Sequence, residues 1–184
     1  MDAIIKADLY RYQASTGRKQ LIKKLLNPAF LYTFLYRKTA KYSGSSIQGI
    51  FFRILKRHFG YFYGVQIPPT TKIGGGLFIG HVGNIVLNPD AVIGNNCNIA
   101  QGVTIGQENR GQKKGAPKIG NEVWIGANTV IVGNITIGNN VLIAPNCFVN
   151  FDVPNNAVVI SSQCSIHPKE NATENYIDFK YVTP

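Results

Sequence analysis

The stretch PKIGNEVWIGANTVIVGNITIG, residues 117–138, decides the fold, because an aliphatic residue returns at every sixth position along it. The same spacing recurs over about residues 67–160, at Ile67, Ile73, Ile79, Leu87, Ile93, Ile99, Ile105, Ile119, Ile125, Ile131, Ile137, Ile143 and Val149. Glycine follows many of these positions. A six-residue period sustained this long predicts a β-solenoid in which each hexad makes one short strand and one turn.

Stacking explains how such short strands become stable, since a strand of two or three residues buries its apolar side chain only against neighbouring coils. Three hexads per coil give a triangular prism, with glycine and asparagine at corners that need a tight or left-handed backbone. The period slips twice, and we place these departures after Ile85 and in the loop 107–118 that follows Gly106. A long loop on a rigid scaffold is often functional.

Three segments carry a resemblance to a known family. They are Lys72-Ile-Gly-Gly-Gly-Leu-Phe-Ile-Gly-His81, Asn98-Ile-Ala-Gln-Gly-Val-Thr-Ile-Gly106 and Pro117-Lys-Ile-Gly-Asn-Glu-Val-Trp-Ile-Gly-Ala127. With the hexads, they make the chain resemble the left-handed parallel β-helix acyltransferases, and among these serine acetyltransferase and its polysaccharide-modifying relatives. The resemblance covers about residues 61–160. It implies a mainly β fold, acetyl-CoA as the acyl donor without a metal, and a homotrimer with active sites between neighbouring copies.

The charge of the chain is concentrated at one end. The net charge is +10, and residues 1–64 hold twelve Lys and Arg residues against Asp2 and Asp8, so all the excess lies there. We therefore divide the chain into a basic helical segment (1–64), a β-helix (65–160) and a polar tail (161–184). The tail lacks the Gly-x-Pro-Ala segment with which many family members close their last coil.

The pattern of the basic segment predicts three or four amphipathic helices, at about residues 1–13, 18–26, 28–42 and 46–58. Such helices form a cap on the prism, an interfacial surface for an anionic membrane or an acidic glycan, or both. No nucleic-acid-binding motif accompanies the charge, so we expect no nucleic-acid partner.

No apolar run is long enough to span a membrane, and the N-terminus lacks the layout of a signal peptide. Cys97 and Cys147 take inward hexad positions and read as core residues of a reducing compartment, whereas Cys164 lies outside the hexads. We therefore expect a cytoplasmic protein, or one peripheral to the inner face of the cell membrane.

His81 is the candidate catalytic residue, although a lone histidine is commonly a surface residue without a role. It follows Gly80 at an outward position, and an imidazole can take a proton from a hydroxyl at neutral pH. The resemblance implies that the activated hydroxyl attacks the acetyl-CoA thioester directly. In the family, an aspartate in an Asp-Ile-His-Pro segment steers this histidine. The matching stretch is Gln66-Ile-Pro-Pro69, so Gln66 is the candidate to orient His81, without the negative charge of an aspartate.

The resemblance also implies residues for binding CoA. Gly106, Gly126 and Ala127 are small residues where family members lay the pantetheine arm, and Lys114 and Lys118 are candidates to meet its phosphates. Ordinary hexad composition and a solvated loop explain the same residues without a ligand, and both readings stay open here.

Two departures from the family bear on the acceptor. The aspartate that binds serine directly before the histidine is Gly80 here, and the Arg-His-Pro-Lys segment reads Gly115-Ala116-Pro117-Lys118. Losing buried charge-assisted contacts costs about 1.5–3 kcal/mol each. We therefore predict acetyl transfer to a carbohydrate hydroxyl of a capsular, O-antigen or exopolysaccharide or its precursor.

Other functions remain as alternatives to this prediction. Serine O-acetyltransferase is the second expectation, and a non-catalytic structural solenoid is the third. A zinc site would need three converging histidines, and only His81 lies in the coils.

Overall fold

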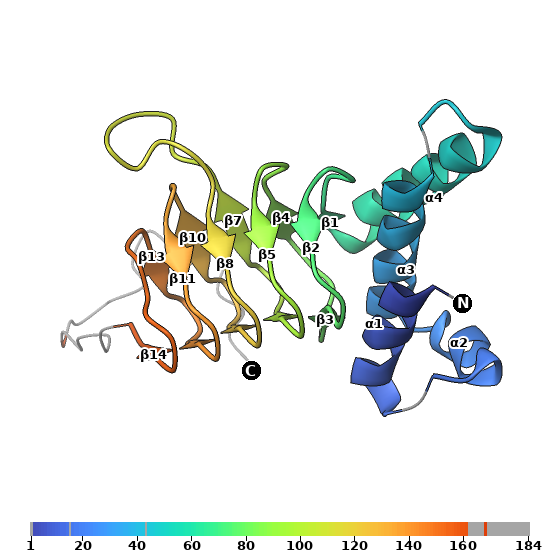
Figure 1. Ribbon diagram of the computed structural model, residues 1–184, viewed down its shortest axis with the longest axis horizontal. Coiled ribbons are helices and arrows are strands. Elements are labelled where there is room, and N and C mark those ends of the chain that lie inside the picture. Colours follow the sequence, from blue (N-terminus) through green and yellow to red (C-terminus); the bar gives the residue numbers. More distant parts are fainter. Residues whose placement is uncertain (1, 15, 43, 162–167, 169–184) are drawn as a thin grey trace, which may run out of the picture.

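The computed structural model describes residues 2–14, 16–42, 44–161 and 168, and shows a rod of β-coils with helices at its N-terminal end (Figure 1). The helices are α1 (Ala3–Gln13), α2 (Arg18–Lys24), α3 (Pro28–Lys41) and α4 (Ile47–Tyr63). Apart from residues 161 and 168, the expected tail and its Cys164 lie outside the described residues. Across the described ranges, no helix has the length and apolar character that crossing a bilayer requires.

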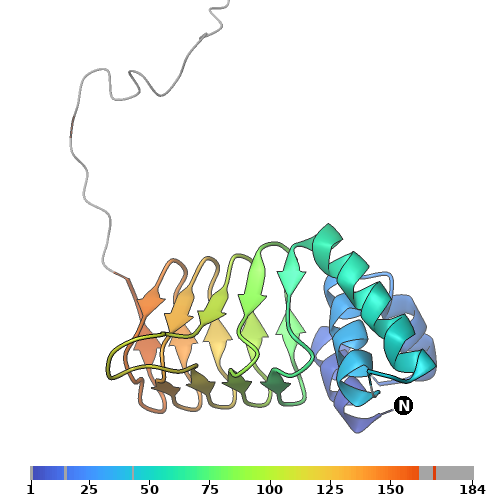
Figure 2. The same ribbon diagram turned by 90° about the horizontal axis from the view of Figure 1, so that it is seen from above.

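The coils form three parallel sheets that run along the rod, which confirms the predicted left-handed parallel β-helix (Figure 2). The first sheet contains β1 (Val65–Gln66), β4 (Ile85–Leu87), β7 (Thr104–Gly106), β10 (Val130–Val132) and β13 (Phe148–Val149). The second contains β2 (Lys72–Ile73), β5 (Val92–Ile93), β8 (Lys118–Ile119) and β11 (Thr136–Ile137). The third contains β3 (Phe78–Ile79), β6 (Asn98–Ile99), β9 (Trp124–Ile125), β12 (Leu142–Ile143) and β14 (Val158–Val159).

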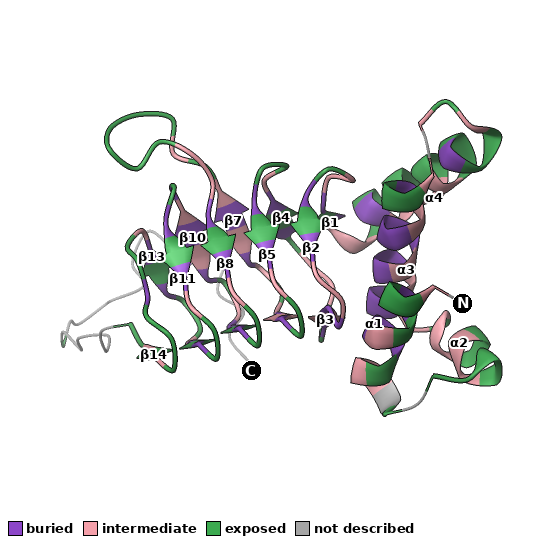
Figure 3. Ribbon diagram, in the orientation of Figure 1, coloured by how far each residue is buried: buried purple, intermediate pink, exposed green. Residues whose placement is uncertain are grey.

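The interior of the rod is the column of aliphatic side chains that the hexads predict. Figure 3 shows buried residues recurring on successive strands along the rod. Ile105, Ile125 and Ile131 are fully buried, and their neighbours along each strand face outward. Burying one such side chain stabilises the fold by about 1.5–3 kcal/mol. Cys97 and Cys147 belong to the same column, and burial raises the pKa of the Cys97 thiol.

Asparagines build the corner between the second and third sheets. The side-chain oxygens of Asn95, Asn121, Asn139 and Asn155 each accept a hydrogen bond from a backbone N–H of the preceding coil, at 2.7–2.9 Å. The result is a ladder of side-chain bonds parallel to the strand pairing. It satisfies backbone donors at a turn, which no strand neighbour reaches.

The first slip of the hexad register lies before Ile85, so the sequence-based placement after Ile85 was wrong. Ile79 pairs with Ile99 and Leu87 pairs with Ile105. Leu87 follows Ile79 by eight positions, whereas Ile105 follows Ile99 by six, which puts two extra residues into the corner 80–84. Periodicity could not locate them, because Ile85 and Leu87 are both buried and either could continue the hexads.

Helix α4 runs to Tyr63, beyond the expected end near His58. Gly64 ends it with φ at 64°, and its N–H donates to Gly60 O. A glycine in this left-handed conformation is a common helix stop. Because β1 begins at the next residue, α4 leads directly into the first coil.

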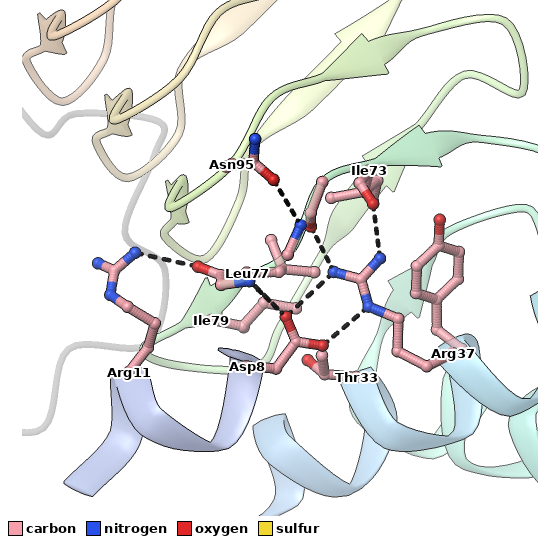
Figure 4. A network of polar contacts seen from close by, with 12 residues as sticks. Asp8, Arg11, Thr33, Arg37, Ile73, Leu77, Ile79 and Asn95 are labelled. Atoms are coloured by element: carbon pink, nitrogen blue, oxygen red, sulfur yellow. Dashed lines mark hydrogen bonds and ion pairs between the residues drawn. The ribbon is translucent and has the colours of Figure 1, made fainter. Parts of the chain in front are cut away.

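A buried ion pair joins the helices to the first coil (Figure 4). Arg37 Nε of α3 lies 2.8 Å from Asp8 Oδ2 of α1. The Arg37 guanidinium also donates to the carbonyls of Ile73 and Gly74, both at 2.6 Å. Asp8 Oδ1 accepts from the backbone N–H groups of Gly76 and Leu77, each at 2.9 Å. Every polar atom of the pair therefore has a partner, which is what a buried charge requires.

Three tyrosine hydroxyls complete the junction between the helices and the coils. Tyr12 donates to Ile79 O at 3.0 Å, Tyr32 accepts from Ile67 N at 3.0 Å, and Tyr36 donates to Thr71 O at 2.5 Å. Burial raises the pKa of Tyr12 and of Tyr32 to about 12. The helices thus cap the N-terminal end of the rod through polar bonds to named backbone groups.

Candidate functional site

His81 lies in the enlarged corner between β3 and β4, and its side chain is exposed. Gly80, the residue before it, has open space around it, since a Cβ there would meet only the Phe78 ring at 3.5 Å. Gly83 and Asn84 close the corner with φ values of 128° and 48°. The two extra residues therefore push His81 out of the regular coil, where its imidazole is open to solvent.

Gln66 lies in β1, on the outer face of the first sheet, where it pairs with Val86. Among the residues that the structure describes, no hydrogen bond joins Gln66 to His81, and neither side chain has a hydrogen-bonding partner. The structure therefore does not bring the two together within one chain, and the role of Gln66 in orienting His81 stays a prediction.

The loop between β7 and β8 projects from the rod, as Figures 1 and 2 show. Glu108 and Gly115 pair at its base, with both N–H to O distances at 2.9 Å. The Lys113 ammonium donates to Asn150 O, which holds the loop toward the C-terminal coils. Lys114 on the loop and Lys118 at the start of β8 are both exposed, so each is free to meet an anion.

The three small candidates for the pantetheine arm differ in their surroundings. Gly106 ends β7, and a Cβ there would come within 3.3 Å of Val132 Cγ1. Gly126 follows β9, and a Cβ there would approach the Pro145 nitrogen to 2.5 Å, so coil packing alone demands glycine. Ala127 is half-buried and its carbonyl accepts from Asn146 N at 2.8 Å.

Apart from Gln66, the predicted site residues lie on two different edges of the prism. His81, Gly126 and Ala127 lie where the third sheet turns into the first, and Gly106, Lys114 and Lys118 lie where the first turns into the second. From Gly83 to Asn88 the chain spans about 16 Å at roughly 3.3 Å per residue. The outer face of the first sheet therefore separates the two groups within one chain.

A basic pocket that the sequence did not reveal lies between α4 and the first coil. Its volume is about 300 Å³, and Arg53, Lys56, Arg57 and Gln66 are among its lining residues. Burial, and then the charge of Arg53, lower the pKa of Lys56 to about 8. The spacing of the three basic residues places them on one side of a helix, and this spacing was the only indication of a basic site that the sequence offered. Their approach to β1 depends on how α4 packs, which the sequence does not show.

No cluster of three or more His, Cys, Asp or Glu side chains suited to a metal ion occurs among the described residues. His58 lies on α4 and His81 lies in the coils. His167, the third histidine, falls outside the described part of the chain.

Comparison with known proteins points to one group. Residues 116–150 match the family model described as bacterial transferase hexapeptide (six repeats). The serine acetyltransferase of Synechococcus elongatus is 39% identical over 97 residues, which cover 53% of this chain and 40% of that protein. The chain therefore spans less than half the length of this curated relative.

Solved structures agree with the sequence matches. Serine acetyltransferase isoform 3 of Entamoeba histolytica, in complex with cysteine, superposes with a TM-score of 0.70 at 30% identity, covering 94% of this chain and 62% of that one. A serine acetyltransferase in complex with CoA gives a TM-score of 0.68 at 28% identity, covering 84% and 64%. The matched hexads, the three-sheeted rod and these likenesses together make the chain similar to the hexapeptide-repeat transferases, and among them to the serine acetyltransferases.

Proposed function

We propose that this protein is an acetyl-CoA-dependent O-acetyltransferase in which His81 is the general base. The observation that carries the proposal is the exposed His81 at an enlarged corner of a hexapeptide-repeat coil. The similarity to serine acetyltransferases, one of them in complex with CoA, supports both the reaction and the donor.

The chemistry needs one proton acceptor and one site for developing negative charge. The His81 imidazole takes the proton of the acceptor hydroxyl while the oxygen forms a bond to the thioester carbonyl carbon. Backbone N–H groups stabilise the resulting oxyanion. The carbon–sulfur bond then breaks, the acetyl group stays on the acceptor, and the imidazolium returns its proton to the CoA thiolate.

We propose that the hydroxyl group of serine is the preferred acceptor of the acetyl group. The support is that the relatives named above are serine acetyltransferases. They favour this acceptor over the carbohydrate that the sequence alone led us to expect first.

A carbohydrate hydroxyl is the second candidate, and one local observation favours it. Gly80 precedes His81, and Gly115 and Ala116 precede Pro117, so none of these positions supplies a charged side chain for an amino acid's ammonium or carboxylate. A neutral acceptor would not need such partners.

The proposed active site is shared between copies of the chain in a homotrimer. The two groups of site residues lie on opposite edges of the first sheet. If the edge with Gly106, Lys114 and Lys118 of one copy faces the edge with His81 of the next, both groups meet around one CoA. Sedimentation at three times the chain mass of 20.2 kDa is the expected result, and a stable monomer with full activity would contradict it.

The proposal is tested by CoA release with L-serine and with a panel of glycans. We expect release with one of these acceptors, and His81→Ala to lower kcat by about 10²–10⁴-fold because it removes the general base. His58→Ala is the matched control, an exposed histidine on α4. Full activity of His81→Ala, or an equal loss in the control, would refute the mechanism.

A second variant separates the two acceptors. The open space at Gly80 admits a side chain, so Gly80→Asp places a carboxylate beside His81. If serine is the acceptor, a charge-assisted bond to its ammonium raises kcat/KM for serine by about tenfold or more. If a glycan is the acceptor, the same variant gains nothing with serine and loses glycan turnover.

A further inference from the structure

Helix α4 is apolar on both of its long sides. Its inner side, with Phe52, Leu55 and Phe59, is half-buried in the helical segment. Its outer side, which we call the α4 outer stripe, consists of Ile47, Ile50, Phe51, Ile54, Tyr61 and Phe62. Their spacing of three, four and seven residues puts them on one face. These six side chains are 48–87% exposed, which is unusual for so many large apolar groups on one helix.

Positive charge borders the α4 outer stripe. Arg53 and Arg57 are exposed, one helical turn apart, and α4 itself has no acidic residue. The two acidic residues in the described helical segment are engaged elsewhere, since Asp8 pairs with buried Arg37 and Asp2 pairs with Lys41 and Lys38. The surface around α4 is therefore both apolar and cationic.

We propose that the α4 outer stripe docks on an anionic lipid bilayer, with Arg53 and Arg57 at the phosphate level and the apolar side chains inserted below them. A basic amphipathic helix of this kind lies in the plane of a membrane interface. Anionic headgroups neutralise the cations that the rest of the segment leaves without acidic partners.

The charge argues against a second copy as the occupant. A two-fold contact between α4 helices would place the same face on both sides of the interface. It would gather Arg53 and Arg57 of both copies with no carboxylate from either α4 to offset them. A bilayer surface offers phosphates instead.

The basic pocket supports the same occupant. It adjoins α4 and is lined by both arginines, by Lys56 and by Tyr61 of the stripe. A headgroup phosphate in this pocket would give the partly buried Lys56 the counter-charge that it lacks. Gln66 also lines this pocket, so its side chain could donate a hydrogen bond to such an anion, independently of any role in catalysis.

The inference is independent of the proposed reaction, because neither needs the other to be correct. The two proposals are connected only through the positions of α4 and His81 in the fold. The helices cap the N-terminal end of the rod (Figure 1). His81 lies in the corner between β3 and β4, directly after the first coil. Docking through α4 would hold this corner near the membrane surface.

Co-sedimentation of the full chain with vesicles tests the proposal. We expect binding to phosphatidylcholine vesicles that contain about 30% phosphatidylglycerol, and at least tenfold weaker binding to pure phosphatidylcholine, because the cations need anionic headgroups. Raising NaCl should weaken the binding, since salt screens exposed charges. Equal binding to both vesicles, or none to either, would overturn the proposal.

Paired variants assign the binding to α4. Ile54→Glu and Phe62→Glu should each lower vesicle binding at least tenfold, and Arg53→Gln/Arg57→Gln should lower it without changing the weak binding to neutral vesicles. Ile160→Glu is the matched control, because Ile160 is 75% exposed at the far end of the rod and Ile54 is 63% exposed. A loss in the control equal to that of Ile54→Glu would refute the assignment.

Other occupants give different results. If the stripe covers a second copy, the wild type sediments as a larger assembly that Ile54→Glu dissociates, and vesicles bind neither form. If its partner is an acidic glycan, polygalacturonate binds the wild type while anionic vesicles do not. Either result overturns the membrane proposal, and circular dichroism of the variants separates lost binding from lost folding.

Discussion

The coils and the junction that caps them are held together in different ways. Inside the coils, the buried core is one column of aliphatic side chains, and Thr129 is a rare buried polar side chain there. At the junction, the buried side chains include Asp8 and Arg37, and the hydroxyls of three tyrosines bond to backbone groups of the first coil. Each coil pairs with the next through the same repeated backbone bonds, asparagine rungs and apolar packing, whereas the helices that end the repeat need their own specific polar partners.

The difference predicts where the molecule is vulnerable. Stability in the coils is spread over similar layers, so one layer can weaken without destroying the others. Stability at the junction depends on a few groups that cannot be replaced by neighbours.

Asp8→Ala should cause the largest loss. It leaves the Arg37 guanidinium buried without its counter-charge, and such a loss costs about 3–5 kcal/mol. We expect urea unfolding followed by circular dichroism to show an early loss of helical signal while the β signal persists. Asp2→Ala is the control, because Asp2 pairs with Lys41 at the surface, and it should leave the midpoint unchanged. A single late transition in Asp8→Ala would contradict the contrast.

Ile125→Ala should cost somewhat less, about 2–4 kcal/mol, because it removes buried methyl groups and leaves a cavity. Ile125 is fully buried in the middle of the column. Here the β signal should be lost at lower urea, and the helices should unfold with it or later. Val92→Ala, at an outward position of the second sheet, should change the midpoint little.

High pH should loosen the junction by about 3 kcal/mol for each tyrosine concerned, because one pKa unit corresponds to about 1.4 kcal/mol. Burial raises the pKa of Tyr12 and Tyr32 from the usual value near 10 to about 12. Their stabilising contribution is complete below pH 10 and is lost as the pH rises from about 10 to 12, because the unfolded chain ionises first. Tyr12→Phe should flatten this part of the profile in urea titrations at each pH. An identical profile in the variant would remove Tyr12 from the explanation.

Lys56→Met should have the smallest effect, a rise in Tm of about 1–3 °C. The pKa of Lys56 falls to about 8, so holding its charge at neutral pH costs stability in the folded state. In the wild type this penalty is relieved as the pH rises from about 8 to 10.5, so the gain from the substitution should vanish there. A lower Tm for Lys56→Met at pH 7 would show that its contact with the Tyr32 ring outweighs the penalty.

Most of the fold could be predicted from the sequence, because the hexad period is set by the fold itself. Each inward aliphatic residue is a local signal that does not depend on distant segments. The position of the enlarged corner could not be predicted, because Ile85 and Leu87 are two positions apart and both fit the inward face. The Asp8–Arg37 pair escaped because a count of charges treats them as surface groups, although Asp8 lies among Ile5, Leu9 and Tyr12 at helical spacing.

The candidate site could be predicted only in part. His81 was predicted from its motif, and the structure shows why this residue is exposed. The residues expected around it lie on two edges of the rod, and a linear pattern carries no information about which edges of separate copies meet. The pocket beside α4 could not be predicted either. It forms between a helix and a strand that are adjacent in the chain, and its shape depends on how their side chains pack.

The asparagine ladder has a consequence for how such a rod can change its length. Asn121 and Asn139 repeat the same bond at a separation of 18 positions, one full turn of the solenoid. A deletion or duplication of one such unit would rejoin identical rungs, so evolution or an engineer can resize the rod in whole steps. Because His81 belongs to the first step, shortening the distal end leaves its distance from the helices unaltered.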